Sequence, residues 1–418
     1  MTFLEQYDSI DPAHPELQMG LFFKNILAGP DTMFAELREH RPIFAMPTAT
    51  LVTRFADVQE ILARPTAFSV RLYQPRMDPS VGPFMLARDG TEINRRDKSI
   101  MMAMLQLRDL PHIADIVTEL ADAALGQTSG TIEIISQLSR LVPIQLTGRY
   151  FGFPGPDTAT MFRWSRATQF DMFHNTPLND PQVHQDNVKA GAEMRQYLIG
   201  LLQQRREELK TNPNLDDILS RLLRTVLPPE LGFDDDRILT NTMGLLVGGV
   251  ETTSAAVALA IDVLLSKLEQ FTAAQGAAVA GNRDLLAQYV WEALRFNPIN
   301  PFVFRFCEAD YELACGTDRR APLKAGTVVL ASTRSAMMDD GEVEYPEEFR
   351  LTRPAYHYMH FGYGHHACLG EQVGTVEIPI LVERLLRKRN LRRAPGDAGQ
   401  LNMENGPFPE RFVLQFDA

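Results

Sequence analysis

The feature that most constrains the fold is a long helical pattern that runs from Asp234 to about Lys267. It begins with a run of aspartates, which favour a helix N-terminus, and at about 1.5 Å per residue it is long enough to cross a globular domain. Two adjacent glycines, Gly248 and Gly249, interrupt its apolar middle, although each costs a helix about 1 kcal/mol relative to alanine. We therefore expect a compensating feature there, either a flat ligand that lies against the helix or a local distortion.

Helical periodicity also dominates the rest of the 418 residues. Strand patterns are few and short, and we find neither an internal repeat nor a long linker. We therefore expect a mainly α fold with small β-sheets. The predicted helices cover residues 33–40, 55–63, 114–126, 134–150, 157–173, 187–210, 215–224, 233–267, 284–296 and 369–388, and the predicted strands cover 48–54, several segments between 302 and 332, and 411–416.

Composition narrows the class of protein. The net charge of −12 argues against general nucleic-acid binding, which requires a basic surface. The low, odd number of cysteines (Cys307, Cys315 and Cys368) argues against a disulfide framework and favours a reducing compartment. The N-terminal residues lack a basic region before an apolar run, and no stretch approaches the roughly 20 apolar residues of a membrane span. We therefore expect a soluble, cytoplasmic protein.

The most informative short segment is a glycine-rich loop, FGYGHHACLG, that runs from Phe361 to Gly370 and precedes an apolar helix. Its glycines allow the backbone to approach a planar group closely, and the N-terminus of the following helix stabilises a thiolate at Cys368. Such a thiolate is suited to bind haem iron. Taken alone, however, a lone cysteine is more often a small core residue. His365, His366 and Cys368 lack the paired spacing of a zinc site, and a cysteine nucleophile would need partners that the sequence does not locate.

The whole loop resembles the haem-binding signature of the cytochrome P-450 family, Phe-Gly-x-Gly-x-His-x-Cys-x-Gly, at every fixed position. The resemblance implies one cytochrome P-450 domain over residues 1–418, a triangular prism with the long central helix over the haem. It also implies that Cys368 binds the iron of haem b (iron protoporphyrin IX) and that His366 reaches a haem propionate. Phe361 and Gly362 would belong to the same cofactor site.

A second match is the segment from Glu292 to Arg295, which resembles the family's Glu-x-x-Arg helix. Residues three apart on a helix can form an ion pair, and the alternative is a pair on a solvated surface. Arg353, in a later segment, resembles the second arginine that joins this pair in the family. The resemblance gives Glu292, Arg295 and Arg353 structural roles, not catalytic ones.

Two further matches concern the haem and oxygen. Arg305 matches the position whose guanidinium binds a haem propionate, a role that suits arginine geometry; alternatively, it faces water on an edge strand. The segment from Gly248 to Thr252 resembles the family's oxygen-activation motif, in which Glu251 and Thr252 relay protons in a dry pocket. Gly248 and Gly249 then make room for haem and oxygen. The alternative is an ordinary helix with a surface carboxylate.

The early helix departs from the family pattern. Most soluble bacterial members carry a His-x-x-x-Arg pair after an Asp-x-x-x-His run, and no histidine stands in the segment that follows Asp89. Direct counting puts Ile93 and Asp97 at the two positions, whereas a slip of one residue puts Asn94 and Lys98 there. We prefer Asn94 and Lys98 as propionate partners, because both are polar donors four residues apart on one helix face.

The segments that line the substrate pocket in the family are apolar in this sequence. Residues 68–86 and 162–174 are rich in aromatic, aliphatic and methionine side chains, which suit either a pocket wall for an apolar small molecule or plain core packing. Arg71 and Arg76 are candidates to meet an acidic substrate group, although surface arginines are common. Because no reductase or ferredoxin sequence is appended, electrons are expected from a separate ferredoxin and ferredoxin reductase.

The resemblance therefore implies a haem-thiolate monooxygenase that inserts one oxygen atom of O2 into an apolar small organic substrate. A peroxygenase or a hydroperoxide-rearranging enzyme is the first alternative. Such enzymes need no redox partner and often lack the acid–threonine pair, so Glu251 and Thr252 count against this alternative. A non-catalytic haem binder is the second alternative, and it has no use for a proton relay.

Overall fold

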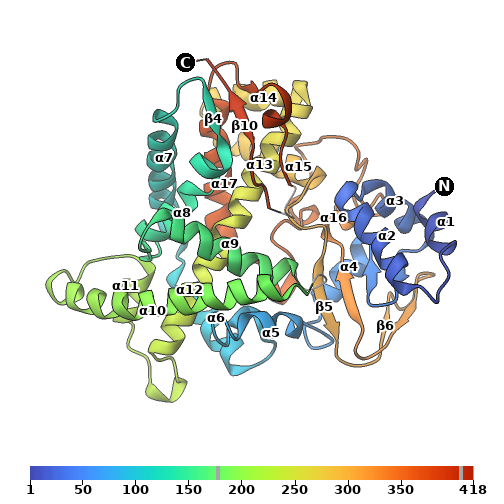
Figure 1. Ribbon diagram of the computed structural model, residues 1–418, viewed down its shortest axis with the longest axis horizontal. Helices are drawn as coiled ribbons and strands as arrows, with labels where there is room; N and C mark the ends of the chain where they lie inside the picture. Colours follow the sequence, from blue (N-terminus) through green and yellow to red (C-terminus); the bar gives the residue numbers. More distant parts are fainter. Residues whose placement is uncertain (176–178, 404–407, 418) are drawn as a thin grey trace. The chain divides into compact units, whose positions relative to one another are not determined.

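The computed structural model describes residues 1–175, 179–403 and 408–417, and its ribbon is mainly helical with short strands (Figure 1). The chain divides into two compact units, each made of two chain segments. The first unit comprises Met1–Leu72 and Leu294–Cys368, and the second comprises Tyr73–Ala293 and Leu369–Ala418. A mainly α fold with small sheets is confirmed, while the single domain over residues 1–418 stays a prediction.

A five-stranded sheet with the order β1-β2-β8-β5-β3 forms the centre of the first unit. β2 and β8 pair in parallel and the other neighbours are antiparallel, which sets Arg305 on β5 opposite Val329 on β8. A separate hairpin joins β6 and β7. The strands are β1 (Ile43–Ala45), β2 (Thr50–Val52), β3 (Phe68–Ser69), β5 (Val303–Cys307), β6 (Tyr311–Leu313), β7 (Ala321–Leu323) and β8 (Val328–Ala331).

One helix of the first unit, α4 (Phe55–Leu62), matters most for the site. Its apolar residues Phe55, Val58, Ile61 and Leu62 recur at helical spacing and are buried in the core of the unit. The backbone N–H of Phe55 donates to Asp339 Oδ2 at 2.7 Å, which satisfies one of the amides that a helix N-terminus leaves open. The other helices are α1 (Phe3–Asp8), α2 (Pro15–Ala28), α3 (Asp31–His40) and α16 (Thr333–Ala336).

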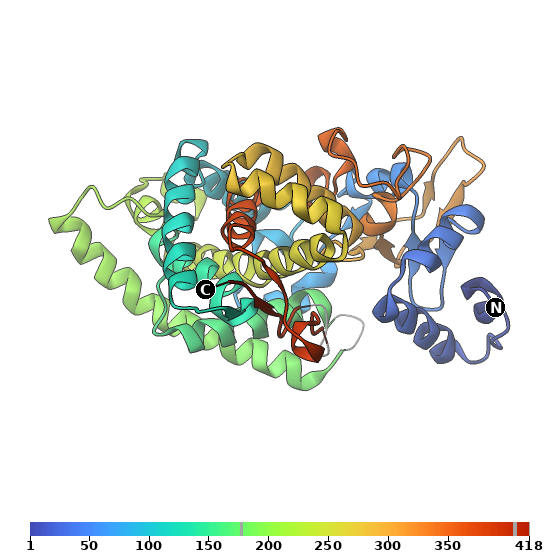
Figure 2. The ribbon, with the colours of Figure 1, turned by 90° about the horizontal axis from the view of Figure 1, so that it is seen from above.

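Helices make up most of the second unit (Figure 2). Within it, α17 packs against α7, α13 and α14, and α10 packs against α9 and α12. A three-stranded antiparallel sheet has the order β4-β10-β9. The elements are α5 (Gln74–Met77), α6 (Glu92–Met104), α7 (Leu110–Gly126), β4 (Thr131–Glu133), α8 (Leu141–Arg149), α9 (Thr158–His174), α10 (Pro181–Thr211), α11 (Ile218–Arg224), α12 (Asp235–Gly249), α13 (Glu251–Ser266), α14 (Leu268–Val279), α15 (Arg283–Phe296, whose last turn enters the first unit), α17 (Glu371–Leu386), β9 (Arg392–Arg393) and β10 (Val413–Gln415).

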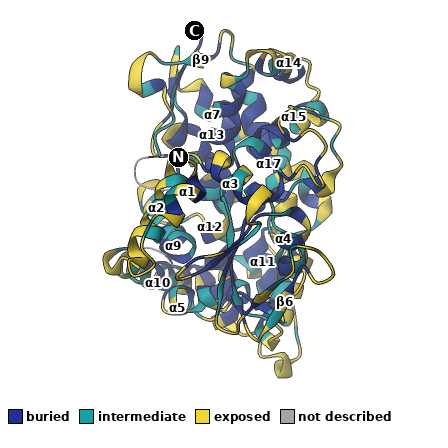
Figure 3. Cartoon of the chain, turned by 90° about the vertical axis from the view of Figure 1, so that its right-hand side faces the viewer, coloured by how far each residue is buried: buried dark blue, intermediate teal, exposed yellow. Residues whose placement is uncertain are grey.

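The long helical pattern of the sequence forms α12 and α13, which are separated at Val250. Asp234 caps the start of α12, because its side chain accepts a hydrogen bond from the backbone N–H of Arg237 at 3.1 Å. Most residues of α13 are buried, as the dark blue of this helix in Figure 3 shows. The predicted helix over 233–267 is therefore confirmed, and the predicted distortion lies directly after Gly248 and Gly249.

The run Asp235–Ser266 is long and apolar enough to cross a membrane by length and composition, with a mean hydropathy of 1.6 in its most apolar window. By length and hydropathy alone the run could be taken for a membrane span, although it does not contain roughly 20 consecutive apolar residues. However, 83% of the window is buried inside the fold. A helix that is apolar on all sides is also what the core of a large domain requires, and we assign the run to the core.

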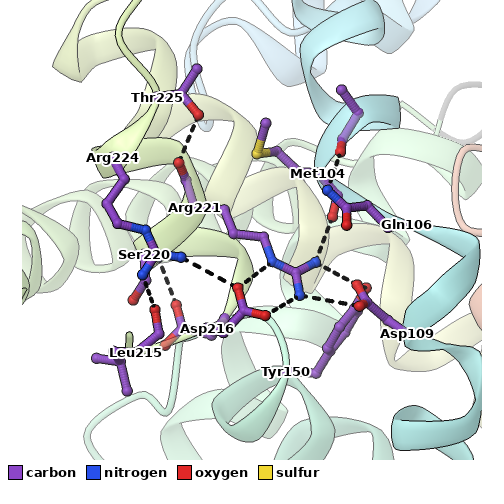
Figure 4. A network of polar contacts seen from close by, with 12 residues as sticks. Met104, Gln106, Asp109, Tyr150, Leu215, Asp216, Ser220, Arg221, Arg224 and Thr225 are labelled. Carbon is purple, nitrogen blue, oxygen red and sulfur yellow. Dashed lines mark hydrogen bonds and ion pairs between the residues drawn. The ribbon is translucent and has the colours of Figure 1, made fainter. Parts of the chain in front are cut away.

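A buried polar network fixes α11 in the second unit (Figure 4). Arg221 donates to both oxygens of Asp216, at 2.7 and 2.9 Å, and also to Asp109. The hydroxyl of Tyr150 donates to the same Asp109 at 2.9 Å, and burial together with this carboxylate raises the pKa of Tyr150. Because a buried guanidinium is tolerated only where its donors are matched, these contacts hold three chain segments together.

Most predicted helices begin and end within a few residues of the observed ones. The prediction of one helix over 134–150 is wrong, because a π-helical turn over Ile135–Ser139 precedes α8. The sequence analysis also overlooked α1, α2, α5, α14 and α16 and the strands β1, β3, β4 and β9. Strands of two or three residues carry too little alternation to be recognised without their pairing partners.

Candidate active site

The cysteine loop folds back on itself in the first unit. The backbone N–H of Cys368 donates to the carbonyl of Phe361 at 2.8 Å, and that of Ala367 donates to Gly364 at 3.1 Å. Gly362 and Gly364 have φ of 74° and 71°, a left-handed conformation that favours glycine. The turn exposes Cys368 just before α17 begins at Glu371.

Gly364 allows the cysteine loop to pack closely against the end of α4. A Cβ at Gly364 would lie 2.7 Å from the carbonyl oxygen of Leu62 and 3.2 Å from the Cα of Ala63, so any side chain would push the loop off the helix. The glycine is therefore required for close packing as well as for its backbone conformation. α4 itself is held by the sheet core, which makes the position of the loop depend on the whole unit.

Arg305 occupies an inner strand, not an edge. β5 lies between β8 and β3, and the Arg305 side chain is 5% exposed. One of its guanidinium nitrogens, Nη1, donates to the carbonyl of Phe304 at 2.8 Å. The alternative of a water-facing arginine on an edge strand is therefore wrong. His366 lies in a single 3-10 turn, Gly364–His366, where its ring meets that of His365 edge to face at 4.8 Å.

Contacts of the early helix α6 distinguish the two candidate pairs for propionate binding, Ile93–Asp97 and Asn94–Lys98. Asp97 is fully buried and accepts hydrogen bonds from Arg237 and from Asn241, so its carboxylate serves the interior of the second unit. Asn94 is also buried and donates to the carbonyl of Met85 at 3.0 Å. Lys98 is half-buried, and burial lowers its pKa. The pair Ile93–Asp97 is thus a poor candidate for propionate binding, because the only polar side chain of the pair, Asp97, is already bound by Arg237 and Asn241.

A stripe that includes two glycines is partly exposed on the long helix formed by α12 and α13. Leu245, Gly248, Gly249 and Thr252 recur at helical spacing and are partly or fully exposed, although most of their neighbours in α12 and α13 are buried. A Cβ on Gly248 would meet no atom of the described chain within 4 Å. The hydroxyl of Thr252 donates to the carbonyl of Gly248 at 2.7 Å, a contact of the kind that bends helices.

Glu251 is fully buried and is held by two arginines that the sequence analysis missed. Its Oε1 accepts from Arg140 at 2.6 and 3.0 Å, and its Oε2 accepts from Arg166 at 2.9 Å. Arg166 also binds Glu410 near the C-terminus. The reading of Glu251 as a surface charge is therefore wrong. A buried carboxylate predicts that some cation lies nearby, but no sequence pattern identifies which one.

The Glu-x-x-Arg residues are buried, as a structural role requires. Glu292 and Arg295 are both 0% exposed, so the alternative of a solvated pair is wrong. Arg295 donates to the carbonyls of Met337 and Glu348, each at 3.1 Å. Arg353 donates to the same Glu348 carbonyl at 2.8 Å. The two arginines therefore hold one backbone segment of the first unit between them.

Arg71 and Arg76 both pair with carboxylates of the chain itself. Arg71 pairs with Glu308 at 3.2 Å and covers the ring of Phe306. Arg76 donates to the buried Asp171 at 2.8 Å. In the segment 68–86 most apolar side chains are buried, which is the pattern of core packing. In the segment 162–174 several aromatic side chains keep some exposure: Phe162, Phe170 and Phe173.

An open hollow on the second unit is lined by residues of α9, α10 and the turn before α9: Pro156, Trp164, Ala192, Glu193, Gln196 and Tyr197. Of these residues only Trp164 belongs to a segment discussed above, 162–174, and its side chain is buried. We therefore do not associate this hollow with the candidate active site.

The donor set in each unit fits a haem group. The first unit presents one exposed thiol in a glycine-rich turn and one buried arginine. The second unit presents a partly exposed stripe with two glycines on an otherwise buried helix. Within the described residues no cluster of three or more His, Cys, Asp or Glu side chains could hold a bare metal ion. A single thiolate is instead suited to an iron that a porphyrin already holds.

The sequence profile of the family described as Cytochrome P450 matches residues 157–414, which is more than half of the chain. A haem-thiolate monooxygenase is the class of protein that this match and the fold define. The chain belongs to the cytochrome P450 family, and it is a bacterial-type monooxygenase that acts on small organic substrates.

Relatives match over most of their length. Cytochrome P450(BM-1) from Priestia megaterium is 30% identical over 298 residues, which cover 70% of this chain and 68% of that protein. Nocardicin C N-oxygenase from Nocardia uniformis subsp. tsuyamanensis is 29% identical over 376 residues, covering 85% of this chain and 87% of that protein. The crystal structure of CalO2 gives a TM-score of 0.80 at 21% identity, covering 94% of this chain and 97% of that one, and shows the shared fold.

Proposed function

We propose that Cys368 is the axial thiolate ligand of the haem iron in this monooxygenase. The observation that carries the proposal is the closed glycine turn that exposes this thiol directly before α17. The other cysteines are poorer candidates. Cys307 is buried in β5, donates its S–H to the carbonyl of Ala309 at 3.0 Å, and has its pKa raised by burial. Cys315 lies in the turn of the β6–β7 hairpin, outside any match to the family signature.

Absorption spectroscopy tests this assignment. The reduced, carbon monoxide-bound protein should show the red-shifted Soret band of thiolate ligation. Cys368→His should lose this band, whereas Cys307→Ser and Cys315→Ser should keep it. Loss of the band in Cys315→Ser would make the assignment wrong.

Arg305 and His366 are proposed to bind the haem propionates, with Lys98 and Asn94 of α6 in supporting roles. A propionate would favour the charged form of Lys98, whose pKa burial lowers. The amide of Asn94 already serves the Met85 carbonyl, which makes it the weaker contributor. Arg305→Leu should lower the haem retained per protein after gel filtration, and Lys98→Leu should do so more mildly. Full haem content in both variants would remove the propionate argument.

Glu251 and Thr252 are proposed to relay protons to the oxygen site. The bound haem supplies the iron at which dioxygen is reduced and cleaved. The hydroxyl of Thr252 stands on the partly exposed stripe of the helix, where it can pass a proton on once it turns from the Gly248 carbonyl. Glu251 is the adjacent acid, but its carboxylate is tied to Arg140 and Arg166. It must leave at least one arginine to exchange a proton with water.

The electron donors are proposed to be a separate ferredoxin and ferredoxin reductase, and the compartment the cytoplasm. This proposal is supported by the match to bacterial cytochrome P450 proteins such as cytochrome P450(BM-1). None of the three cysteines forms a disulfide, which suits a reducing compartment. The substrate is proposed to be an apolar small molecule, because the partly exposed face of α9 is mainly aromatic.

One comparison separates the monooxygenase from a peroxygenase or hydroperoxide-rearranging enzyme. Turnover of one substrate is measured with ferredoxin, reductase and NAD(P)H, and again with peroxide alone. Thr252→Ala should keep consuming electrons in the first assay while it releases peroxide instead of product. Faster turnover with peroxide, unaffected by Thr252→Ala, would instead favour the peroxygenase or lyase.

A further inference from the structure

Arg166 of α9 is shared between two carboxylates of the second unit. Its Nε donates to Oε2 of Glu251 at 2.9 Å, and its Nη1 donates to Oε1 of Glu410. Its third nitrogen, Nη2, donates to the carbonyl of Pro409 at 3.3 Å, and the guanidinium lies over the ring of Phe408. Because the donors of a guanidinium form a rigid fork, Arg166 cannot pair ideally with both acids at once.

Arg140, the other partner of Glu251, is bound differently. Its Nε and Nη2 both donate to Oε1 of Glu251, at 3.0 and 2.6 Å, and Nη2 also donates to the carbonyl of Phe162 at 2.9 Å. In the part of the chain that the structure describes, no hydrogen bond or ion pair joins Arg140 to a second carboxylate. Arg140 therefore fixes Oε1 of Glu251, whereas Oε2 is bound by an arginine that has an alternative partner.

Exposure to water increases along this series of contacts. Glu251 is completely buried, the side chain of Arg166 is 21% exposed, and that of Glu410 is 35% exposed. The series Glu251, Arg166 and Glu410 therefore leads from the interior of the unit to its surface. A shift of Arg166 toward Glu410 would leave Oε2 of Glu251 open to a water molecule that enters from the surface.

The backbone holds Glu410 in place for this exchange of partners. Its N–H donates to the carbonyl of Asn402 at 2.9 Å, and the N–H of Asn402 donates to the carbonyl of Arg411 at 2.9 Å. The carboxylate of Glu410 is thus presented from a paired backbone segment. Arg166, by contrast, reaches both acids with a long side chain that has several rotatable bonds.

We propose that Glu410 is a positioning residue of the proton relay, which draws Arg166 away from Oε2 of Glu251 so that this oxygen can exchange a proton with water. This inference rests on the proposed relay function of Glu251, which it deepens by naming the residue that controls it. The proton comes from the solvent, and Glu251 is again a carboxylate once it has passed the proton on, so no other reactant is needed. Without a carboxylate at position 410, Arg166 would stay on Glu251 and slow the exchange.

Turnover of one substrate by the haem-loaded protein, with ferredoxin, reductase and NAD(P)H, tests the proposal. At saturating substrate, Glu410→Gln should slow product formation about fivefold, which corresponds to about 1 kcal/mol in the barrier. The solvent deuterium isotope effect on kcat should rise, because proton delivery becomes slower. Substrate affinity and haem content should stay at their wild-type values. Glu410→Asp should recover most of the rate, since it keeps a carboxylate.

Glu193→Gln is the matched control. Glu193 pairs with Arg163, which also lies on α9, and its side chain is 34% exposed, almost the same as that of Glu410. This variant should keep the rate within about 1.5-fold of wild type and leave the isotope effect unchanged. Glu410→Gln should also have no further effect on the isotope effect in an Arg166→Gln background, because Glu410 acts through Arg166.

Urea unfolding gives a measurement that does not depend on turnover. The double variant Glu410→Gln, Arg166→Gln should have an unfolding equilibrium constant about fivefold smaller than the two single effects predict together, because the two side chains bind each other. Independent effects would overturn the proposal.

The turnover of two variants separates this inference from the relay itself. A rate in Glu410→Gln equal to or above that of wild type, with a slow Glu251→Gln, would overturn the role of Glu410 and leave the relay standing. Wild-type rates in both variants would contradict the relay as well. A loss of rate in Glu410→Gln that is equally large when Arg166 is absent would also overturn the proposal, because Glu410 would then act by another route.

Discussion

Two buried glutamates in the second unit differ in whether arginine side chains bind their carboxyl groups. Glu251 on α13 and Glu377 on α17 are both almost completely buried, and their helices pack together. Glu251 is ion-paired with Arg140 and Arg166. By contrast, Oε1 of Glu377 has no hydrogen-bond partner in the described chain, and burial raises the pKa of this carboxyl to about 8. The two sites therefore differ in their neighbouring charges: two arginines lie against Glu251, whereas burial alone raises the pKa of Glu377.

The largest expected difference between the two glutamates is in turnover. Glu251→Gln should slow ferredoxin-supported turnover by roughly 10²–10³-fold, because it removes a positioned proton donor. Glu377→Gln should change turnover by about threefold or less, since within the described residues no hydrogen bond or ion pair joins Glu377 to Glu251 or to its two arginines. Steady-state product formation measures both variants. Equal losses of turnover in the two variants would contradict a specific role of Glu251 in proton transfer.

The second difference is in the pH dependence of stability. The pKa of Glu377 is raised from its ordinary 4.5 to about 8, so between these values the folded protein holds a proton that the unfolded chain has lost. This contribution to stability is complete below pH 4.5 and is lost as the pH rises to 8, at most about 1.4 kcal/mol per pH unit. Urea unfolding from pH 5 to 8 measures it. Glu377→Gln should flatten the dependence, and an unchanged slope in this variant would contradict the assignment.

The smallest expected effect concerns the cations. Arg166→Gln should lower the free energy of unfolding by roughly 1–3 kcal/mol, because it leaves part of a buried carboxylate unmatched. Arg283→Gln is the control: Arg283 also pairs with a buried carboxylate, Glu383, but its side chain is 47% exposed. It should cost about 1 kcal/mol or less. Chemical denaturation at pH 7 compares the two, and an equal cost would mean that the Glu251 pair is no more than a surface salt bridge.

Sequence patterns alone predicted the features that depend on local spacing. The aspartates before α12, the apolar period of α12 and α13, and the glycine turn before Cys368 are all contiguous, and each is present as predicted. The distortion was also anticipated from Gly248 and Gly249, and it lies at Val250. Helix boundaries and tight turns follow from backbone preferences of a few neighbouring residues, and those preferences are visible in the chain itself.

Contacts between distant segments were decided by the tertiary structure. In the sequence, direct counting put Ile93 and Asp97 at the two positions of the early helix, and we preferred Asn94 and Lys98; in the fold, the carboxylate of Asp97 binds Arg237 of α12. Arg76 was a candidate for substrate binding in the sequence, but in the fold its guanidinium donates a hydrogen bond to Asp171 of α9. In both cases the residue that forms the ion pair lies far away in the sequence. The contact forms only because two helices pack together in the fold.

The sequence by itself therefore determined the family, the mainly helical fold and the thiol in its glycine turn, because each depends on residues that are close in the chain. Only the tertiary structure decided how the buried carboxyl groups are matched: two arginines bind Glu251, whereas Oε1 of Glu377 has no hydrogen-bond partner within the described residues. The physical reason is that the cost of burying a polar group depends on every neighbour within a few ångströms. Those neighbours lie on other helices. The periodicity of the sequence predicts each helix by itself, but it does not predict which helices pack together.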